Sequence, residues 1–206
     1  MNTYIIDTNI LFNMEANMGL GPSTKEILQN LVKILPLAKK NEEELLMPPA
    51  IVQEIESFFD NQDDALLKAF LGFVTVRSPS YHDSAVSGDL FNDLIEDYRS
   101  RAYRGMKVSE EEIIKAAETF MGKEVLPQKD FQKSVGKIIS SLRDRYRNAT
   151  RTGTIDSPAD FDLIMLAKES DGNLITTDEG IIAWSRKIGV TEMSAQVFGK
   201  KMRAYL

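Results

Sequence analysis

The chain has 206 residues, of which 43% are hydrophobic and 27% are charged, and its formal net charge is −6. This composition indicates one globular domain, or one domain with a sizeable insertion, and the lack of cysteine excludes disulfides, thiolate metal sites and thiol nucleophiles. Because no apolar run approaches the roughly 20 residues of a membrane helix and no signal peptide is visible, we expect a cytoplasmic protein with no membrane partner.

The N-terminal segment predicts a strand that ends in an acid. Residues Thr3–Ile6 are rich in β-formers, Asp7 follows directly, and the apolar run Ile10-Leu11-Phe12 comes next. In α/β proteins, ligands bind in the crevice beyond the carboxyl ends of the strands. Asp7 is therefore a candidate site residue.

Helix and strand patterns alternate up to residue 76. Ser23 and Glu26 have the spacing of a capping box and precede apolar residues at helical spacing. Short strands are predicted at residues 45–47 and 73–76. Between them, Pro49 suits the first turn of a helix over residues 50–59, and this helix carries Glu54.

Residues from about 84 to 150 have a different character. Three helical patterns, around residues 90–104, 110–121 and 131–149, follow one another without a convincing strand, and Pro127 and glycine-containing junctions separate them. We expect an all-helical insertion that forms a helical hairpin.

The end of this predicted insertion is basic although the whole chain is acidic. Between residues 133 and 151 a single acid, Asp144, stands among Lys133, Lys137, Arg143, Arg145, Arg147 and Arg151. Such a run is the electrostatic footprint of a nucleic-acid-binding surface. A solvated helix face is the alternative interpretation.

The C-terminal segment returns to strand–helix alternation. It contains a helix over residues 160–170, a strand over 173–176, a helix over 179–188 and a last helix from Ser194. The pattern as a whole predicts an α/β fold, in which a mainly parallel sheet is flanked by helices and interrupted by the all-helical insertion. We expect a single domain of residues 1–206.

Acids that are far apart in the sequence stand at strand ends or helix starts, which suggests one metal site assembled by folding. Like charges in one pocket raise each other's pKa, and Mg²⁺ or Mn²⁺ would relieve that repulsion because both prefer carboxylate oxygens. We interpret Asp7, Asp160 and Asp178 as metal ligands, with Glu54 completing the cluster. Asp156 precedes Asp160 by four residues and shares its face if that turn is helical.

Each acid also has a purely structural interpretation. Asp7 or Asp178 could cap the helix that follows it, and Asp160 could complement a helix dipole. Glu54 could be a solvated helix residue, and Asp162 is expected to face solvent or to cap. The joint arrangement, with a strand leading into both terminal aspartates, favours a site.

These motifs resemble those of a known family. Ile5-Ile6-Asp7-Thr8-Asn9, an acid in the second strand–helix unit, an aspartate opening a late helix and Thr176-Thr177-Asp178 are similar, in that order, to the motifs of PIN-domain nucleases. The chain is similar in particular to the minimal protein-only ribonuclease P family called HARP. That similarity lies in Met47-Pro-Pro-Ala50, Arg143-Asp-Arg145-Tyr-Arg147 and Ser157-Pro-Ala-Asp160-Phe-Asp162.

The resemblance implies a PIN-like fold and a Mg²⁺-dependent endoribonuclease that removes the 5′ leader from precursor tRNA without an RNA subunit. The products would be a mature tRNA with a 5′-phosphate and a leader with a 3′-hydroxyl. Family members form homo-oligomers through the helical insertion. The resemblance further implies that the catalytic acids are Asp7, Asp156, Asp160 and Asp178, to which the residue reasoning adds Glu54.

The same resemblance implies that Arg143 and Arg147 contact the substrate. Residues at i and i+4 share a helix face, and arginine suits bidentate phosphate binding. Arg145 and Arg151 belong to the same basic run and are added as candidate contacts. A structured tRNA would be recognised through its shape and backbone, by a patch that oligomerisation repeats.

Two alternatives stay open. The first is a PIN ribonuclease that acts on other RNA, such as single-stranded mRNA or rRNA. The second is a non-catalytic RNA-binding partner of an RNA-processing assembly, in which the acids would be helix caps and the basic helix the functional part. The number of metal ions, the oligomer size and the roles of Glu54 and Asp162 are also open.

Overall fold

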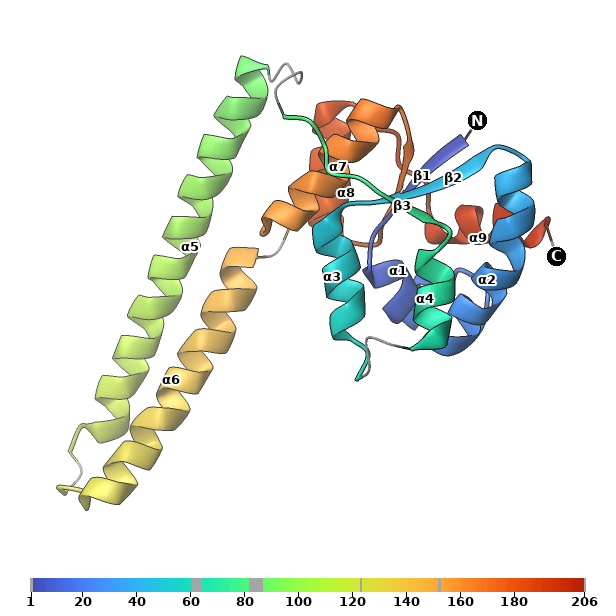
Figure 1. Cartoon of the computed structure of the whole chain (residues 1–206). Helices are drawn as coiled ribbons and strands as arrows, with labels where there is room; N and C mark the ends of the chain where they lie inside the picture. The colour runs from blue at the N-terminus through green and yellow to red at the C-terminus, as the bar shows by residue number, and fades with distance from the viewer. Residues whose placement is uncertain (1, 61–63, 82–86, 123, 152, 206) are drawn as a thin grey trace. The chain divides into compact units, whose positions relative to one another are not determined.

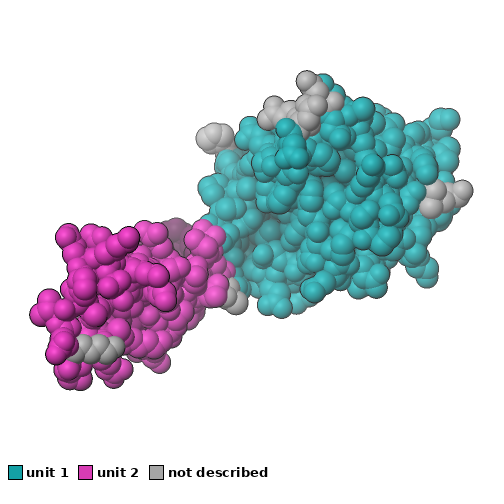
Figure 2. Space-filling model, turned by 90° about the horizontal axis from the view of Figure 1, so that it is seen from below, with its two compact units in different colours: residues 1–85, 153–206 teal, residues 86–152 magenta. Residues whose placement is uncertain are grey.

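The structure is a computed structural model, and it describes all residues except 1, 61–63, 82–86, 123, 152 and 206 (Figure 1). The chain divides into two compact units, coloured separately in Figure 2. Unit 1 consists of residues 1–85 and 153–206, and unit 2 consists of residues 86–152. Residue 84, where the sequence places the start of the insertion, lies outside the described residues. A single PIN-like domain over residues 1–206 stays a prediction.

Unit 1 is built on a parallel sheet of four strands, β1 (Asn2–Ile6), β2 (Glu43–Met47), β3 (Val74–Val76) and β4 (Asn173–Ile175). The strand order is β3-β2-β1-β4, and every pair of neighbours is parallel. The predicted α/β fold with a mainly parallel sheet is therefore confirmed. Tyr4, Ile5 and Ile6 are fully buried, as expected for a central strand of a sheet covered on both faces.

Two groups of helices cover this sheet. α7 (Pro158–Ser170) packs on β1 and against α8 (Glu179–Ile188), and α2 (Thr24–Lys40) packs on β2 and against α4 (Ala65–Leu71) and α9 (Ala195–Arg203). Figure 1 shows the two groups on opposite sides of the strands. The remaining helices of unit 1 are α1 (Asn9–Phe12), the 3₁₀ helix η1 (Met14–Ala16) and α3 (Pro49–Ser57). No helix in the described ranges is long and apolar enough to cross a membrane.

The sequence patterns located most of these elements. Ser23 caps α2 as predicted, Pro49 opens α3, and Ser194 caps α9. The patterns gave no bounds for α1, η1 and α4, because elements of four, three and seven residues are too short to show a helical period. α1 is the helix that follows Asp7, but its N-cap is Thr8 and no side chain of the described residues caps it, so the capping role considered for Asp7 is wrong.

Unit 2 consists of two long helices, α5 (Gly88–Phe120) and α6 (Gln128–Arg151), which pack side by side (Figure 1). The all-helical insertion is confirmed, but the predicted break between residues 104 and 110 is wrong, since α5 is continuous there. Gly105 lies inside α5 and is buried, and a Cβ atom at this position would lie 2.6 Å from Cε2 of Tyr146 on α6. This glycine therefore lets the two helices approach each other and does not end a helix.

Candidate active site

A cavity of about 400 Å³ in unit 1 gathers four of the five acids predicted to be catalytic. Asp7 follows β1, Glu54 is on α3, Asp160 is in the first turn of α7, and Asp178 directly precedes α8. These four acids line the cavity together with Thr8, Asn9, Phe12, Asn13, Phe58 and Ile181. The fold thus brings together carboxylates from four elements, beside the carboxyl ends of β1 and β4.

Asp7 is the buried acid of this cavity, with 6% of its surface exposed. Burial raises the pKa of its carboxyl from 3.8 to about 6. Hydrogen bonds from the Thr176 hydroxyl and the Asn9 backbone N–H oppose this rise in pKa, and the charges of Asp160 and Glu54 add to it. The ionised form of Asp7 is therefore costly unless a cation neutralises it.

The hydroxyl of Thr176 joins the ends of β1 and β4. It donates to Oδ2 of Asp7, and it accepts hydrogen bonds from Nδ2 of Asn9 at 3.3 Å and from the backbone N–H of Asp178 at 3.0 Å. In return, Oδ1 of Asn9 accepts a hydrogen bond from the backbone N–H of Thr177 at 3.2 Å. Sequence reasoning assigned no role to Asn9 and Thr176, although both stand in the two motifs that contain the acids.

Glu54 is tied to the same region by a residue that sequence reasoning also passed over. Oγ1 of Thr8 donates to Oε2 of Glu54 at 3.0 Å. Thr8 is buried and directly follows Asp7, whereas Glu54 is exposed. This bond directs the carboxylate of α3 towards the end of β1.

Asp178 and Asp160 both hold helix ends. Oδ1 of Asp178 accepts a hydrogen bond from the backbone N–H of Ile181 at 2.9 Å and caps α8. Asp160 forms a capping box with Ser157, whose backbone N–H donates to Oδ2 of Asp160 at 3.1 Å. The structural interpretation of these acids is therefore realised, yet both also line the cavity. A carboxylate has about four acceptor sites, so a capping bond leaves capacity for a ligand.

Asp156 and Asp162 lie outside the residues that line the cavity. The backbone N–H of Asp156 donates to Oδ2 of Asp160 at 3.3 Å, so Asp156 adjoins a cavity acid. Asp162 instead accepts a hydrogen bond from the hydroxyl of Tyr81, and burial raises the pKa of its carboxyl. Burial also raises the pKa of Asp160.

The donor set of the cavity fits a hard divalent cation. Carboxylate oxygens are the ligands that Mg²⁺ and Mn²⁺ prefer. Within the described part of the chain, no three acidic or histidine side chains lie close enough together to hold a metal ion between them. Mg²⁺ is commonly held by one or two carboxylates and keeps several waters, which substrate phosphates can replace. Acids arranged around an open cavity suit that mode of binding.

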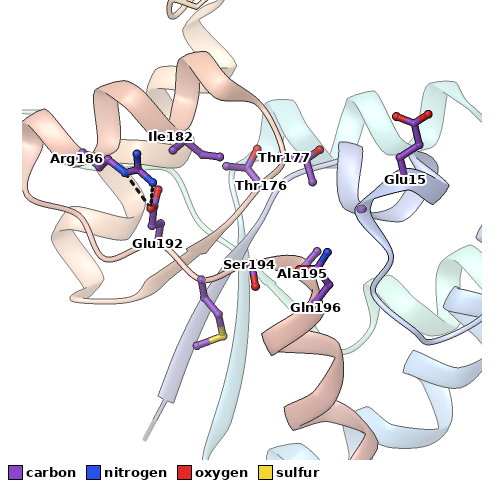
Figure 3. Close-up of a pocket in the computed structure, with 11 residues that line it drawn as sticks. Glu15, Thr176, Thr177, Ile182, Arg186, Glu192, Ser194, Ala195 and Gln196 are labelled. Atoms are coloured by element: carbon purple, nitrogen blue, oxygen red, sulfur yellow. Dashed lines mark hydrogen bonds and ion pairs between the residues drawn. The ribbon is translucent and has the colours of Figure 1, made fainter.

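A second cavity, of about 360 Å³, adjoins the loop between β4 and α8 (Figure 3). Thr176 and Thr177 line it, together with residues of η1, α8 and the start of α9. Arg186 and Glu192 face each other in Figure 3, and Nε of Arg186 lies 2.9 Å from Oε1 of Glu192. Because its arginine is already paired, this cavity offers no comparable cluster of charge, and the acidic cavity is the candidate active site.

The arginines predicted to bind substrate lie on α6, and they differ in their contacts. Arg145 is paired with two acids of α5, and Nη1 lies 2.6 Å from Oε1 of Glu112, while Nη2 pairs with Glu111. These contacts raise the pKa of Arg145. Arg143 and Arg147 are exposed, and neither guanidinium meets a carboxylate within the described ranges. Arg151 ends α6 and is also exposed.

Comparisons with known proteins agree over nearly the whole chain. The family model of the PINc domain ribonucleases matches residues 3–206. The RNA-free ribonuclease P of Haloarcula marismortui is 31% identical over 205 residues, which cover 98% of this chain and 91% of that protein. The RNA-free ribonuclease P of Thermococcus onnurineus is 31% identical, across 95% of this chain and 90% of its own length. The RNA-free ribonuclease P of Pyrococcus furiosus is 30% identical, across 96% of this chain and 91% of its own length.

Proposed function

Because the chain belongs to the PINc domain ribonucleases, and among them to the family whose curated members are named RNA-free ribonuclease P, we propose that it is a metal-dependent endoribonuclease that removes the 5′ leader of precursor tRNA. It does so without an RNA subunit. The observation that carries this proposal is the cavity at the carboxyl ends of β1 and β4, on which four acids meet. The products are a mature tRNA with a 5′-phosphate and a leader with a 3′-hydroxyl.

In this proposal Asp7, Asp160 and Asp178 hold Mg²⁺, with Mn²⁺ as a substitute. When bound, the ion would supply an activated water and would neutralise charge that develops on the phosphate. The Thr176 hydroxyl and the Asn9 backbone N–H fix the orientation of the Asp7 carboxylate. The capping bonds of Asp160 and Asp178 hold the other two acids on the rigid ends of α7 and α8.

Glu54 and Asp156 take supporting parts in the same site. Glu54 lines the cavity and accepts a hydrogen bond from the Thr8 hydroxyl, and in this proposal it orients the attacking water. Asp156 adjoins Asp160 and adds negative charge beside it, so it strengthens the attraction for the cation. In this proposal Glu54 acts on the attacking water, and Asp156 acts through Asp160 on the cation.

The substrate is bound by the basic run of α6. Arg143 and Arg147 are one helical turn apart and exposed, so their guanidinium groups are available to RNA phosphates. Arg151 continues the run at the end of the helix. Glu111 and Glu112 neutralise the charge of Arg145. We therefore propose that Arg145 stabilises the hairpin of α5 and α6, and that it contributes less than Arg143 and Arg147 to substrate binding.

Homo-oligomers form through the hairpin of unit 2 in this proposal. α6 buries no residue and α5 buries only Gly105 and Glu112, although both helices carry large apolar side chains. Tyr98, Ile113 and Ile114 are 71%, 67% and 58% exposed. Large apolar side chains that stay exposed on both helices of a pair favour an interaction surface there. A second copy of this chain would cover them and would repeat the basic run of α6.

The deciding experiment uses purified full-length protein and a 5′-labelled precursor tRNA, with Mg²⁺ or with EDTA, and maps the cut. We expect cleavage at the junction of leader and tRNA body that depends on the metal. Asp7→Ala and Asp160→Asn should each lower the rate by more than about 100-fold, since loss of an outer-shell partner of a metal ligand alone costs about 10–100-fold.

Asp162→Asn is the matched control, because it changes an acid of the same helix that lies outside the cavity. Its cleavage rate should stay close to that of the wild type. Cuts at other places, or in unstructured RNA, would replace the proposal by a PIN ribonuclease with another substrate. Binding without cleavage by the wild type would identify a non-catalytic RNA-binding partner instead.

A further inference from the structure

Two phenylalanine rings stand beside the acids on the wall of the acidic cavity. Phe12 comes from α1 and Phe58 from the C-terminal end of α3, and both line the cavity. Their ring centroids are 4.3 Å apart, with an angle of 28° between the ring planes, so the rings are stacked. Phe59 meets Phe12 edge-on from the same end of α3, with centroids 6.2 Å apart. Phe58 nevertheless stays 57% exposed.

The stacked rings of Phe12 and Phe58 lie next to the hydrogen bond between Thr8 and Glu54. Thr8 and Phe12 are four residues apart at α1, and Glu54 and Phe58 are four residues apart at α3, where Phe58 still has α-helical dihedrals. Residues at this spacing share a helix face. The bond from Thr8 to Glu54 and the stack of Phe12 on Phe58 are thus two contacts between the same faces, about one helical turn of 5.4 Å apart.

Phe58 stays accessible beside the acids although Phe12 stacks on it. It lines the acidic cavity, and 57% of its surface is exposed in spite of the stacked contact with Phe12. An apolar ring that is exposed to water is stabilised when another apolar surface covers it. Aromatic rings of this kind bind splayed, unpaired nucleobases by stacking, because every base has a π-face.

We propose that Phe58, supported by Phe12, is the stacking platform for a nucleobase that flanks the cleaved phosphodiester. Because Phe58 and the acids line the same cavity, a base next to a phosphate bound at the acids would lie beside this ring. The platform selects an unpaired nucleotide at the cleavage point and accepts any base identity. The inference rests on the proposed function only for the identity of the RNA that supplies the base.

The test measures stacking directly with 2-aminopurine, a fluorescent adenine analogue that is quenched when it stacks. The probe is placed next to the cleaved bond of a precursor tRNA, and separately in a short single-stranded RNA, and binding is followed in EDTA. Wild type and Phe58→Trp should quench both RNAs. Phe58→Ala and Phe58→Leu should lose the quenching, and their kcat/KM on the precursor tRNA should fall about tenfold, the typical effect of losing one stacked base.

Leu37→Ala is the control, since Leu37 is also exposed and apolar but is on α2 outside the cavity. It should quench and cleave like the wild type, and circular dichroism checks that all variants fold. Unchanged quenching and cleavage in Phe58→Ala would overturn the inference alone. If the wild type does not cut precursor tRNA but quenches the single-stranded probe through Phe58, the proposed function fails and the platform stands.

Discussion

Asp7 is the one acid of the cavity, among the four that line it, whose side chain is buried. Its carboxyl is buried, and its pKa of about 6 lies above the ordinary value of 3.8. A folded-state pKa above the unfolded value means that the fold binds the proton more tightly. The associated stability is complete below about pH 4 and is lost as the pH rises through about 6. A shift of this size corresponds to about 3 kcal/mol at neutral pH.

Removal of this charge should stabilise the metal-free protein. We expect Asp7→Asn to raise the free energy of unfolding at pH 7.5 by up to about 3 kcal/mol and to flatten its decline between pH 4 and pH 7, because the amide has no proton to lose. Urea denaturation in EDTA across this pH range measures both effects. Added Mg²⁺ should then stabilise the wild type more than the variant. Equal pH profiles for the two proteins would show that Asp7 ionises without cost.

The sequence identified the acids of the cavity better than the residues that hold them. Asp7, Glu54, Asp160 and Asp178 line one cavity, as the strand and helix patterns predicted, and their catalytic roles stay predictions. Asn9 and Thr176 were missed, because their contacts join positions 167 to 169 residues apart and leave no local pattern.

In the hairpin of α5 and α6, contacts between the two helices outweigh the local preference of Gly105 for a helix end. A glycine within a helix costs about 1 kcal/mol relative to alanine, so the region around Gly105 reads as a helix boundary. Contact with Tyr146 of the neighbouring helix explains why a glycine stands there. Periodicity predicted the long helices, and only the partner helix could reveal that two of the three predicted segments form one.

The arginines of α6 should separate into two classes on mutation. Within the described residues, Arg145→Ala leaves Glu112, which is 3% exposed, with Lys115 at 3.0 Å as its one cationic partner, so the variant should unfold at a lower temperature than Arg143→Ala. Arg145 lowers the pKa of Glu112, and the stability from this pair is lost as the pH falls towards that lowered value. Thermal unfolding followed by circular dichroism at pH 7 and pH 4 measures both effects.

RNA binding supplies the complementary measurement. Arg143→Ala should reduce the slope of log affinity against log salt by about one, the effect of one lost phosphate contact, and Arg145→Ala should leave the slope unchanged. If both variants reduced the slope equally, Arg145 would contact RNA as well as Glu111 and Glu112.

For the whole molecule, the exposed apolar side chains of unit 2 lead to a test of assembly. Ile113→Glu places a charge on a side chain that is 67% exposed, so it should reduce the oligomer mass measured by light scattering after size-exclusion chromatography. Leu37→Glu, which alters an exposed residue of α2, should leave the mass unchanged. A wild type that is monomeric, or an Ile113→Glu variant with unaltered mass, would contradict assembly through the hairpin.

The strand order of the sheet has a consequence for the synthesis of the protein. β1 is made first, but one of its two neighbours is β4, which the ribosome adds only after residue 172. Asp178 and the Thr176 hydroxyl that orients Asp7 come later still. A nascent chain therefore carries Asp7 without the other wall of the cavity until β4 and Asp178 have been added. If these acids cut RNA as proposed, we expect a nascent chain to be inactive towards RNA around the ribosome until Thr176 and Asp178 have been added.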